Sequence, residues 1–409
     1  MTTTAAPTHG RYGLPLHVRY CRRCTISNQR PSSTVEFRAT ASDRKETIHF
    51  SDDGLCDACR WFELKADIDW VERDRQLRDS CDQFRRTDGR YDVLVPGSGG
   101  KDSIYVAHLL RYRYGMHPLT VTWPPMLYTS AGRRNFEAWL ASGFANYTLW
   151  PDRKVHRLLT QLAFRNLVHP FQPFIIGQRN VAPRIAAMMD IPFIMYGENQ
   201  AEYGNKISEN RRPRMDTAFF TQERDLRQTF LGGVSAHDIL RDYKLQPNDL
   251  EPYLPIDPAV LDRSPIEVHY MSYYVPWHPQ EVYYYCVEQT AFLPNDTRTE
   301  GSYSKYSSID DKIDWLHYYT THAKFGIGRA TYDTSQEIRN GDLTRDEGVR
   351  LVRRFDGEPP RKHLAAILDY LDMPESGFHD TIDAARPDHL WAIGPDGHWT
   401  LRHPIWAAA

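Results

Sequence analysis

Apolar runs of strand length alternate with amphipathic stretches along the middle of the chain. We expect strands at 91–95, 119–123, 147–150 and 191–196, and helices after 100 and at 131–140, 153–168 and 181–189. Strands that alternate with helices pair in parallel through right-handed crossovers. The pattern therefore predicts an α/β fold with a doubly wound parallel sheet, whose ligands lie at the carboxyl ends of the strands.

The pattern changes at both ends of the chain. Residues 20–60 are bounded by cysteines and predict two short strands, at 35–37 and 48–50, while the charged stretch 61–88 is expected to be a connector helix. After residue 206 the chain is loop-rich and aromatic, and several helices are expected within 308–372. We expect three parts: an N-terminal ribbon and connector at 1–88, the sheet domain at 89–235, and a mainly helical substrate-binding region at 236–409.

Composition narrows the class of partner. The 409 residues include 50 Lys and Arg against 53 Asp and Glu, a formal net charge of −3, whereas nucleic-acid binding normally needs a basic surface. No apolar stretch reaches the roughly 18 residues of a membrane span, and no signal-peptide pattern opens the chain. We therefore expect a cytoplasmic protein that binds neither nucleic acid nor membrane.

A glycine-rich turn follows the first expected strand and precedes a helix. Gly99 and Gly100 permit close backbone approach to an anion, and the helix N-terminus and Lys101 supply positive charge. Asp102 in place of Ser or Thr excludes a Walker A loop. The residues alone allow a phosphate-binding loop or a structural turn that caps the helix, and the strand–turn–helix context favours the first.

Two Cys-x-x-Cys pairs lie in the N-terminal part, formed by Cys21, Cys24, Cys56 and Cys59. Four thiolates in two such pairs fit a tetrahedral structural Zn²⁺ site. The alternatives are an iron–sulfur cluster or unligated cysteines. Cys81 and Cys286 have no paired neighbour, and we expect both to be packing residues.

Longer motifs connect these features to a known family. Ser98-Gly-Gly-Lys-Asp-Ser103 after an apolar strand is the signature of the PP-loop ATP pyrophosphatases, which cleave ATP between the α- and β-phosphates. Further matching stretches are Tyr20–Cys24, His169–Gln178, Tyr196–Asn205, Gly301–Tyr306 and Lys324–Ala330. On these stretches, residues 18–372 resemble the N-acetyl sugar amidotransferases, and most closely the branch that makes acetamidino forms of nonulosonic acids, such as pseudaminic acid, for flagellin glycosylation.

The resemblance implies a two-step reaction. The acetamido oxygen of an N-acetyl sugar would receive AMP from ATP, and ammonia would then displace AMP to leave an acetamidino group. No glutaminase segment is recognised in the sequence, so ammonia is expected either free or from a separate glutaminase subunit.

The expected site residues follow from the loop and from the resemblance. ATP binding is expected at Ser98, Gly99, Gly100, Lys101, Asp102 and Ser103, catalysis at Lys101, Asp102, Glu198 and Glu202, and substrate binding at Asn199, Lys305, Lys324 and Arg329. The carboxylates of Asp102, Glu198 and Glu202 are candidates for holding Mg²⁺, which prefers oxygen ligands. Solvated loop carboxylates and an ordinary glycine turn near Arg329 are the alternatives from the residues alone.

Two rival functions remain open. Some tRNA-modifying PP-loop enzymes of the thiolation type also carry zinc ribbons, but they typically need a basic surface and further catalytic cysteines. A zinc-containing binding subunit that has lost catalysis is the second rival, and the intact Lys101 and Asp102 argue against it. The aromatic block 269–285 is either core or a surface on which a sugar stacks.

Overall fold

The computed structural model describes residues 8–407. Five parallel strands form one sheet in the order β3-β2-β1-β4-β7. The strands are β1 (Val93–Pro96), β2 (Pro118–Thr122), β3 (Asn146–Thr148), β4 (Phe193–Tyr196) and β7 (Glu267–Tyr270). This confirms the predicted α/β class with a parallel sheet, a cysteine cluster near the N-terminus and a helical C-terminal region.

Helices cover both faces of the sheet. Along β1, Leu94 faces one core together with α5 and α6, while Val93 and Val95 face a second core together with α2, α3, α4 and α10. These three β1 residues are apolar and fully buried, as expected for a strand of a parallel sheet that helices cover on both faces. The helices named here are α2 (Trp70–Phe84), α3 (Lys101–Tyr112), α4 (Ser130–Ala141), α5 (Arg153–Leu167), α6 (Gln172–Met189) and α10 (Pro279–Gln289).

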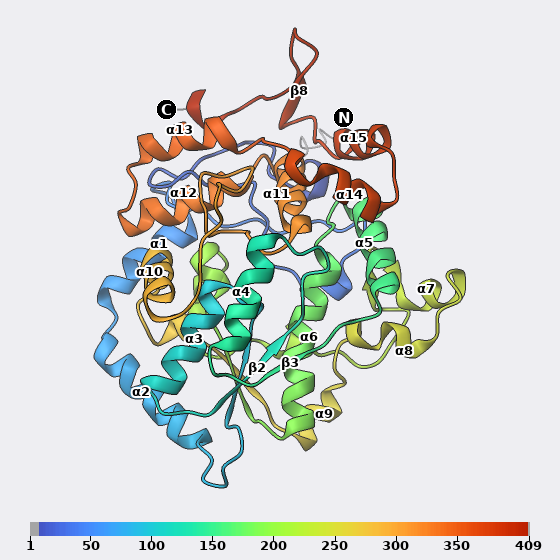
Figure 1. Cartoon of the computed structure of the whole chain (residues 1–409). Coiled ribbons are helices and arrows are strands. Elements are labelled where there is room, and N and C mark those ends of the chain that lie inside the picture. The colour runs from blue at the N-terminus through green and yellow to red at the C-terminus, as the bar shows by residue number, and fades with distance from the viewer. Residues whose placement is uncertain (1–7, 408–409) are drawn as a thin grey trace, which may run out of the picture.

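The remaining helices lie mainly in the second half of the chain. They are α1 (Asp57–Leu64), α7 (Ala236–Asp242), α8 (Pro247–Leu250), α9 (Pro258–Arg263), α11 (Lys312–Phe325), α12 (Arg329–Asn340), α13 (Arg345–Phe355), α14 (Leu364–Leu371) and α15 (Glu375–Ala384). Two small antiparallel pairs complete the structure: β5 (Phe230–Leu231) with β6 (Val234–Ser235), and β8 (Trp391–Ile393) with β9 (Trp399–Leu401). Figure 1 shows α11–α15 gathered above the sheet, with the blue N-terminal segment running among them.

The N-terminal part differs from its prediction. The expected strands at 35–37 and 48–50 are replaced by a short 3₁₀ turn at Glu36–Arg38 and by isolated bridges that join Pro31 to Thr47 and Phe50 to Cys56. The expected connector helix 61–88 is broken between α1 and α2, because Ile68 is extended and Asp69 caps α2 through the Val71 and Glu72 amides. The alternation of apolar and polar residues therefore did not predict strands correctly in this segment, where the cysteine cluster determines the backbone path.

The sheet extends beyond residue 235, where the sequence suggested a domain boundary. Its edge strand β7 lies at Glu267–Tyr270 and pairs along β4. The aromatic block 269–285 covers the end of β7 and most of α10, and its Tyr274, Trp277 and Val282 are buried in the second core. Within residues 8–407, no helix combines the length and the apolar composition needed to cross a lipid bilayer.

Candidate active site and cysteine cluster

The glycine-rich turn lies between β1 and α3, at the carboxyl edge of the sheet. Gly99 has φ +90°, and a Cβ on it would lie 2.7 Å from the Asn135 carbonyl oxygen of α4, so only glycine fits there. Ser103 Oγ donates to the Gly100 carbonyl at 3.0 Å, and Ser98 Oγ donates to Asp310 Oδ2 at 2.9 Å. The turn is therefore held open by its packing on α4 and by a carboxylate from the distant C-terminal region.

Lys101 and Asp102 begin α3 and lie beside the end of β4. Lys101 Nζ is 2.6 Å from Asp102 Oδ1. Burial opposes the lysine charge, but Asp102 and Glu198 outweigh it and raise the pKa of Lys101. β1 and β4 are neighbours in the sheet, which brings the two predicted motifs together at one edge.

Glu198 is partly buried at this edge, with a cation, Lys101, and an acid, Asp102, as charged neighbours. Burial and the charge of Asp102 raise its pKa to about 7, against the opposing effect of Lys101. Its carboxylate accepts hydrogen bonds from the Tyr203 hydroxyl and, at 3.2 Å, from Trp277 Nε1. Glu198 is thus oriented by two donors and lies next to the glycine-rich turn.

A cavity of about 330 Å³ opens over the turn, and we call it the phosphate-loop cavity. Its charged lining comprises two cations, Lys101 and Arg329, and six carboxylates, Asp102, Glu198, Asp310, Asp314, Asp333 and Glu337. Such an excess of negative charge would repel a polyphosphate unless divalent cations were also present. The residues therefore fit a nucleotide with Mg²⁺ better than a free anion.

A second cavity, of about 420 Å³, adjoins the first, and we call it the tyrosine cavity. Its lining includes Tyr196, Tyr203, Tyr270, Tyr318 and Tyr332 together with Arg30, Glu36, Gln178 and Arg179. The two cavities share Phe171, Glu198, Tyr203, Asp314 and Tyr318. Aromatic rings and hydrogen-bonding groups are a lining that suits a polar ring ligand.

Arg329 is brought to the phosphate-loop cavity, as the sequence suggested. It starts α12, where its Nε lies 3.0 Å from Asp333 Oδ1 and its Nη1 donates to the Tyr318 hydroxyl at 2.6 Å. Burial disfavours its charge, but Asp333 and neighbouring acidic groups raise its pKa.

Four other predicted site residues lie elsewhere. Glu202 accepts hydrogen bonds from Trp61 Nε1 at 3.1 Å and from Lys65 Nζ at 2.6 Å, so its carboxylate is tied to the N-terminal segment. Asn199 is buried, and its backbone N–H donates to Ser272 Oγ at 3.0 Å. Lys305 is exposed. Among the described residues, neither cavity lining contains these three.

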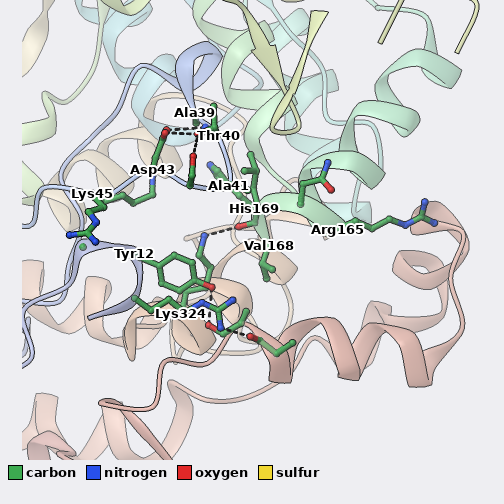
Figure 2. Close-up of a pocket in the computed structure, with 18 of the residues that line it drawn as sticks. Tyr12, Ala39, Thr40, Ala41, Asp43, Lys45, Arg165, Val168, His169 and Lys324 are labelled. Carbon is green, nitrogen blue, oxygen red and sulfur yellow. Dashed lines mark hydrogen bonds between the residues drawn. The ribbon is translucent and has the colours of Figure 1, made fainter. Parts of the chain in front are cut away.

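Lys324 lines a cavity of about 500 Å³ between the N-terminal segment and α5. It also lines a smaller cavity of about 170 Å³, which shares Arg30, Glu36 and Tyr332 with the tyrosine cavity. Figure 2 shows it beside Tyr12 and Val168, and its Nζ donates to the Leu167 carbonyl at 2.7 Å. Burial and the nearby Lys45 lower its pKa to about 7. The structure does not bring Lys324 to the phosphate loop.

Several lining residues were not found from the sequence. Asp310, Asp314, Asp333 and Glu337 carry no motif of their own, and burial raises the pKa of Asp310 and brings that of Asp314 to about 6. The sequence feature that could have pointed to them is the position of Asp310, which lies shortly after the matching stretch that ends at Tyr306.

The four N-terminal cysteines form a buried cluster. Cys21 Sγ lies 3.7 Å from Cys59 Sγ, Cys24 Sγ lies 3.7 Å from Cys56 Sγ, and all four sulfurs lie within 4.8 Å of one another. Sulfurs placed tetrahedrally at about 2.3 Å from one zinc would be about 3.8 Å apart. The cluster can therefore hold a metal such as zinc.

The cysteine cluster packs against α12. Ile327 and Ile338 join its apolar surroundings. The Thr25 hydroxyl lies 2.7 Å from Thr334 Oγ1 and 2.9 Å from Ser335 Oγ. The N-terminal cluster thereby supports the helix that carries Arg329 into the phosphate-loop cavity.

Comparison with known families adds evidence for the C-terminal region. Residues 300–402 match the family described as "LPS biosynthesis protein WbpG-like, C-terminal domain". The match supports a sugar-modifying biosynthetic enzyme family. No curated protein matches the chain. The matched segment contains α11 and α12, and with them Asp310, Arg329 and Asp333 of the phosphate-loop cavity.

Proposed function

We propose that the protein is an ATP-dependent amidotransferase that converts an acetamido group of an N-acetyl sugar, of the nonulosonic acid type, into an acetamidino group. The observation that carries the proposal is the shared wall around Glu198 and Tyr203, where the phosphate-loop cavity meets the tyrosine cavity. A nucleotide in the first and a sugar in the second would meet at this wall. The C-terminal family match supports a sugar as the substrate.

In the proposed reaction the acetamido oxygen attacks the α-phosphorus of ATP, and pyrophosphate leaves. Ammonia then attacks the activated carbon, AMP leaves with the former acetamido oxygen, and the nitrogen loses its surplus protons. Adenylation is needed because an amide oxygen is otherwise a very poor leaving group. The protein contributes positioning and fixed charge.

The chain's own groups divide into three roles. The turn from Ser98 to Ser103 offers backbone amides to the phosphates, and its two serine hydroxyls brace the turn through Asp310 and the Gly100 carbonyl. Lys101 adds a charge that Asp102 and Glu198 maintain. The carboxylates of Asp102 and Glu198 are the groups that would hold Mg²⁺, which would offset the negative charge of the phosphates. Arg329 faces the same space from α12 and can neutralise developing phosphate charge.

Zinc is proposed for the cysteine cluster, in a structural role. All four thiols are buried, and a closed set of four sulfur ligands leaves no open position for a substrate. In this proposal the ammonia is either free in solution or supplied by a separate glutaminase subunit.

The rival thiolation function is disfavoured by the one cysteine after the phosphate loop. Cys286 is buried, its Sγ contacts the Lys101 carbonyl at 3.1 Å, and burial raises its pKa to about 12. A thiol with such a pKa is almost entirely protonated at neutral pH and is a weak nucleophile.

The test is a pyrophosphate-release assay with ATP, Mg²⁺, ammonium and a panel of N-acetyl sugars, with mass spectrometry of the sugar product. The expected result is sugar-dependent release and a product lighter by about one mass unit, because oxygen is replaced by NH. Release that depends on RNA, or release of inorganic phosphate alone, would contradict the proposal.

A further inference from the structure

Arg30 is a buried cation with two guanidinium nitrogens that have no hydrogen-bond partner among the described residues. Its side chain is only 5% exposed, and the two nitrogens are Nε and Nη1. The Tyr332 ring lies 5.7 Å from the guanidinium carbon. Arg30 lines the tyrosine cavity and does not line the phosphate-loop cavity.

The backbone holds Arg30 firmly at this place. It lies between the two cysteine pairs, where the Arg30 carbonyl accepts from the Ile48 amide at 2.9 Å and the Ser32 amide donates to the Glu46 carbonyl at 2.9 Å. A bridge joins Pro31 to Thr47. The guanidinium is therefore presented by a braced segment rather than by a loose loop.

An unpaired buried guanidinium is unfavourable, because arginine stays protonated and its five N–H donors lose water on burial. Proteins normally satisfy such a group with a carboxylate or a phosphate, often through two parallel hydrogen bonds. Three carboxylates line the same cavity, those of Glu36, Glu198 and Asp314, and among the described residues none of them accepts a hydrogen bond from Arg30 Nε or Nη1. An anionic ligand would supply the missing partner.

The second arginine of the cavity adds to this argument. Arg179, on α6, donates through Nη1 to the Thr34 carbonyl at 3.1 Å, which leaves other donors of its guanidinium for a ligand. Two guanidinium groups from different segments thus border one cavity lined by tyrosines.

From these contacts we infer that Arg30 is the residue that binds an anionic group of the sugar substrate, so that the N-terminal cysteine-bounded segment forms part of the sugar site. The anion is a carboxylate on the sugar or a phosphate linked to it. The identification of the ligand as a sugar rests on the proposed function, but binding of the anion to Arg30 can be measured without turnover.

The experiment measures ligand binding to the full-length, metal-loaded protein by isothermal titration calorimetry. The three probes are N-acetylneuraminic acid, its uncharged methyl ester, and UDP-N-acetylglucosamine. The variants are Arg30→Gln, which removes the charge, Arg30→Lys, which keeps it, and Arg38→Gln as a control on an exposed arginine of the same segment.

For a carboxylate ligand, we expect wild type to bind the acid at least about tenfold more tightly than the ester. Arg30→Gln should remove that preference, Arg30→Lys should keep part of it, and Arg38→Gln should leave it unchanged. For a phosphate ligand, wild type should bind the nucleotide sugar, Arg30→Gln should weaken that binding by at least about tenfold, Arg30→Lys should weaken it less, and Arg38→Gln should leave it unchanged. Circular dichroism and metal content must stay at wild-type values in each variant.

Three results would overturn the inference: no binding of any probe to the wild type, equal loss of acid and ester in Arg30→Gln, or no loss at all. Failure of the proposed function has a different signature. Arg30-dependent binding without pyrophosphate release, when ATP and ammonium are added, would retain the anion site and reject the amidotransferase reaction.

Discussion

Two buried lysines of this protein have pKa values shifted in opposite directions, because their neighbouring charges differ. At Lys101 the charges of Asp102 and Glu198 exceed the cost of burial, so the pKa rises and the cation is kept. At Lys324 the nearby Lys45 adds to that cost and the pKa falls to about 7. Lys101 is therefore suited to binding phosphate. Lys324 loses much of its positive charge near neutral pH.

For Lys101→Ala, we expect pyrophosphate release to fall by at least about 100-fold, because a fixed charge at the phosphates is lost. The measurement is the sugar-dependent release assay, with thermal unfolding to show that the chain still folds. Lys154→Ala, at an exposed lysine on α5, is the matched control and should retain full activity. Undiminished release by Lys101→Ala would refute the role of this side chain.

For Lys324→Met, we expect a pH-dependent change in stability. The folded pKa, about 7, lies below the value of 10.5 for an ordinary lysine, so folding expels a proton between these pH values. Below pH 7 the buried lysine therefore lowers the free energy of unfolding of the wild type by its full amount. As the pH rises from 7 towards 10.5, this loss of stability shrinks by about 1.4 kcal/mol per pH unit. Urea unfolding at pH 7 and pH 9 should show wild type gaining stability relative to the variant. A constant difference would contradict the assigned burial.

How far single residues could be predicted depended on whether a local motif marked them. The run from Ser98 to Ser103 was found because its spacing alone describes a strand, a turn and a helix start. Asp314 and Arg30 were missed because only tertiary packing brings them to the cavities. Lys324 was expected to bind substrate by resemblance. The structure places it outside the linings of the two cavities, where its Nζ donates to the Leu167 carbonyl, but in a smaller cavity that shares Arg30 and Glu36 with the tyrosine cavity.

At the scale of elements, the turn between β1 and α3 depends on its neighbour α4. Gly99 fits against the Asn135 carbonyl, and Ser98 is bonded to Asp310 from the segment before α11. The turn's shape is thus set by three elements that are far apart in the sequence.

For Gly99→Ala, we expect activity at least about 100-fold lower, because the loop must shift by a fraction of an ångström to about 1 Å to clear α4. Gly89→Ala is a matched control: Gly89 also has positive φ, +79°, but nothing lies within 4 Å of an added Cβ. Both variants incur the backbone cost of about 1 kcal/mol, and only Gly99→Ala has the clash. Equal activity of the two variants would show that contact with α4 does not matter.

The three inner strands of the sheet, β1, β2 and β4, were predictable to within a few residues, because apolar runs buried on both faces have a strong signature. The break at Ile68 and Asp69 was not, since the apolar spacing of 61–88 is continuous across it. β7 was also missed, because its short run lies in an aromatic stretch that equally suits a buried helix.

At the scale of the whole molecule, the two ends of the chain pack together. The Tyr20 hydroxyl donates to the His403 carbonyl at 2.8 Å, and Leu14 shares a core with Phe325 and Trp391. The cysteine cluster lies within the same assembly, against α12. Its metal would therefore stabilise much more than the N-terminal segment.

For Cys59→Ser, we expect loss of about one zinc equivalent per chain and a large fall in thermal stability, since structural zinc supplies about 10–16 kcal/mol in zinc-finger peptides. Cys81→Ser, at a buried cysteine outside the cluster, should retain the metal. Metal content by mass spectrometry and the unfolding temperature are the measurements. Iron, or no metal, in the wild type would contradict the zinc assignment.

The contact between the cysteine cluster and α12 also bears on how the chain is made. On the ribosome, Cys21 to Cys59 emerge first, but the Ile327 and Ile338 surface that covers them emerges only after most of the protein has been synthesised. At about 5–20 residues per second, the interval is on the order of tens of seconds. During that time a nascent chain would expose Ile26 and Ile48, so early metal capture would shield the thiols while this surface waits for its partner.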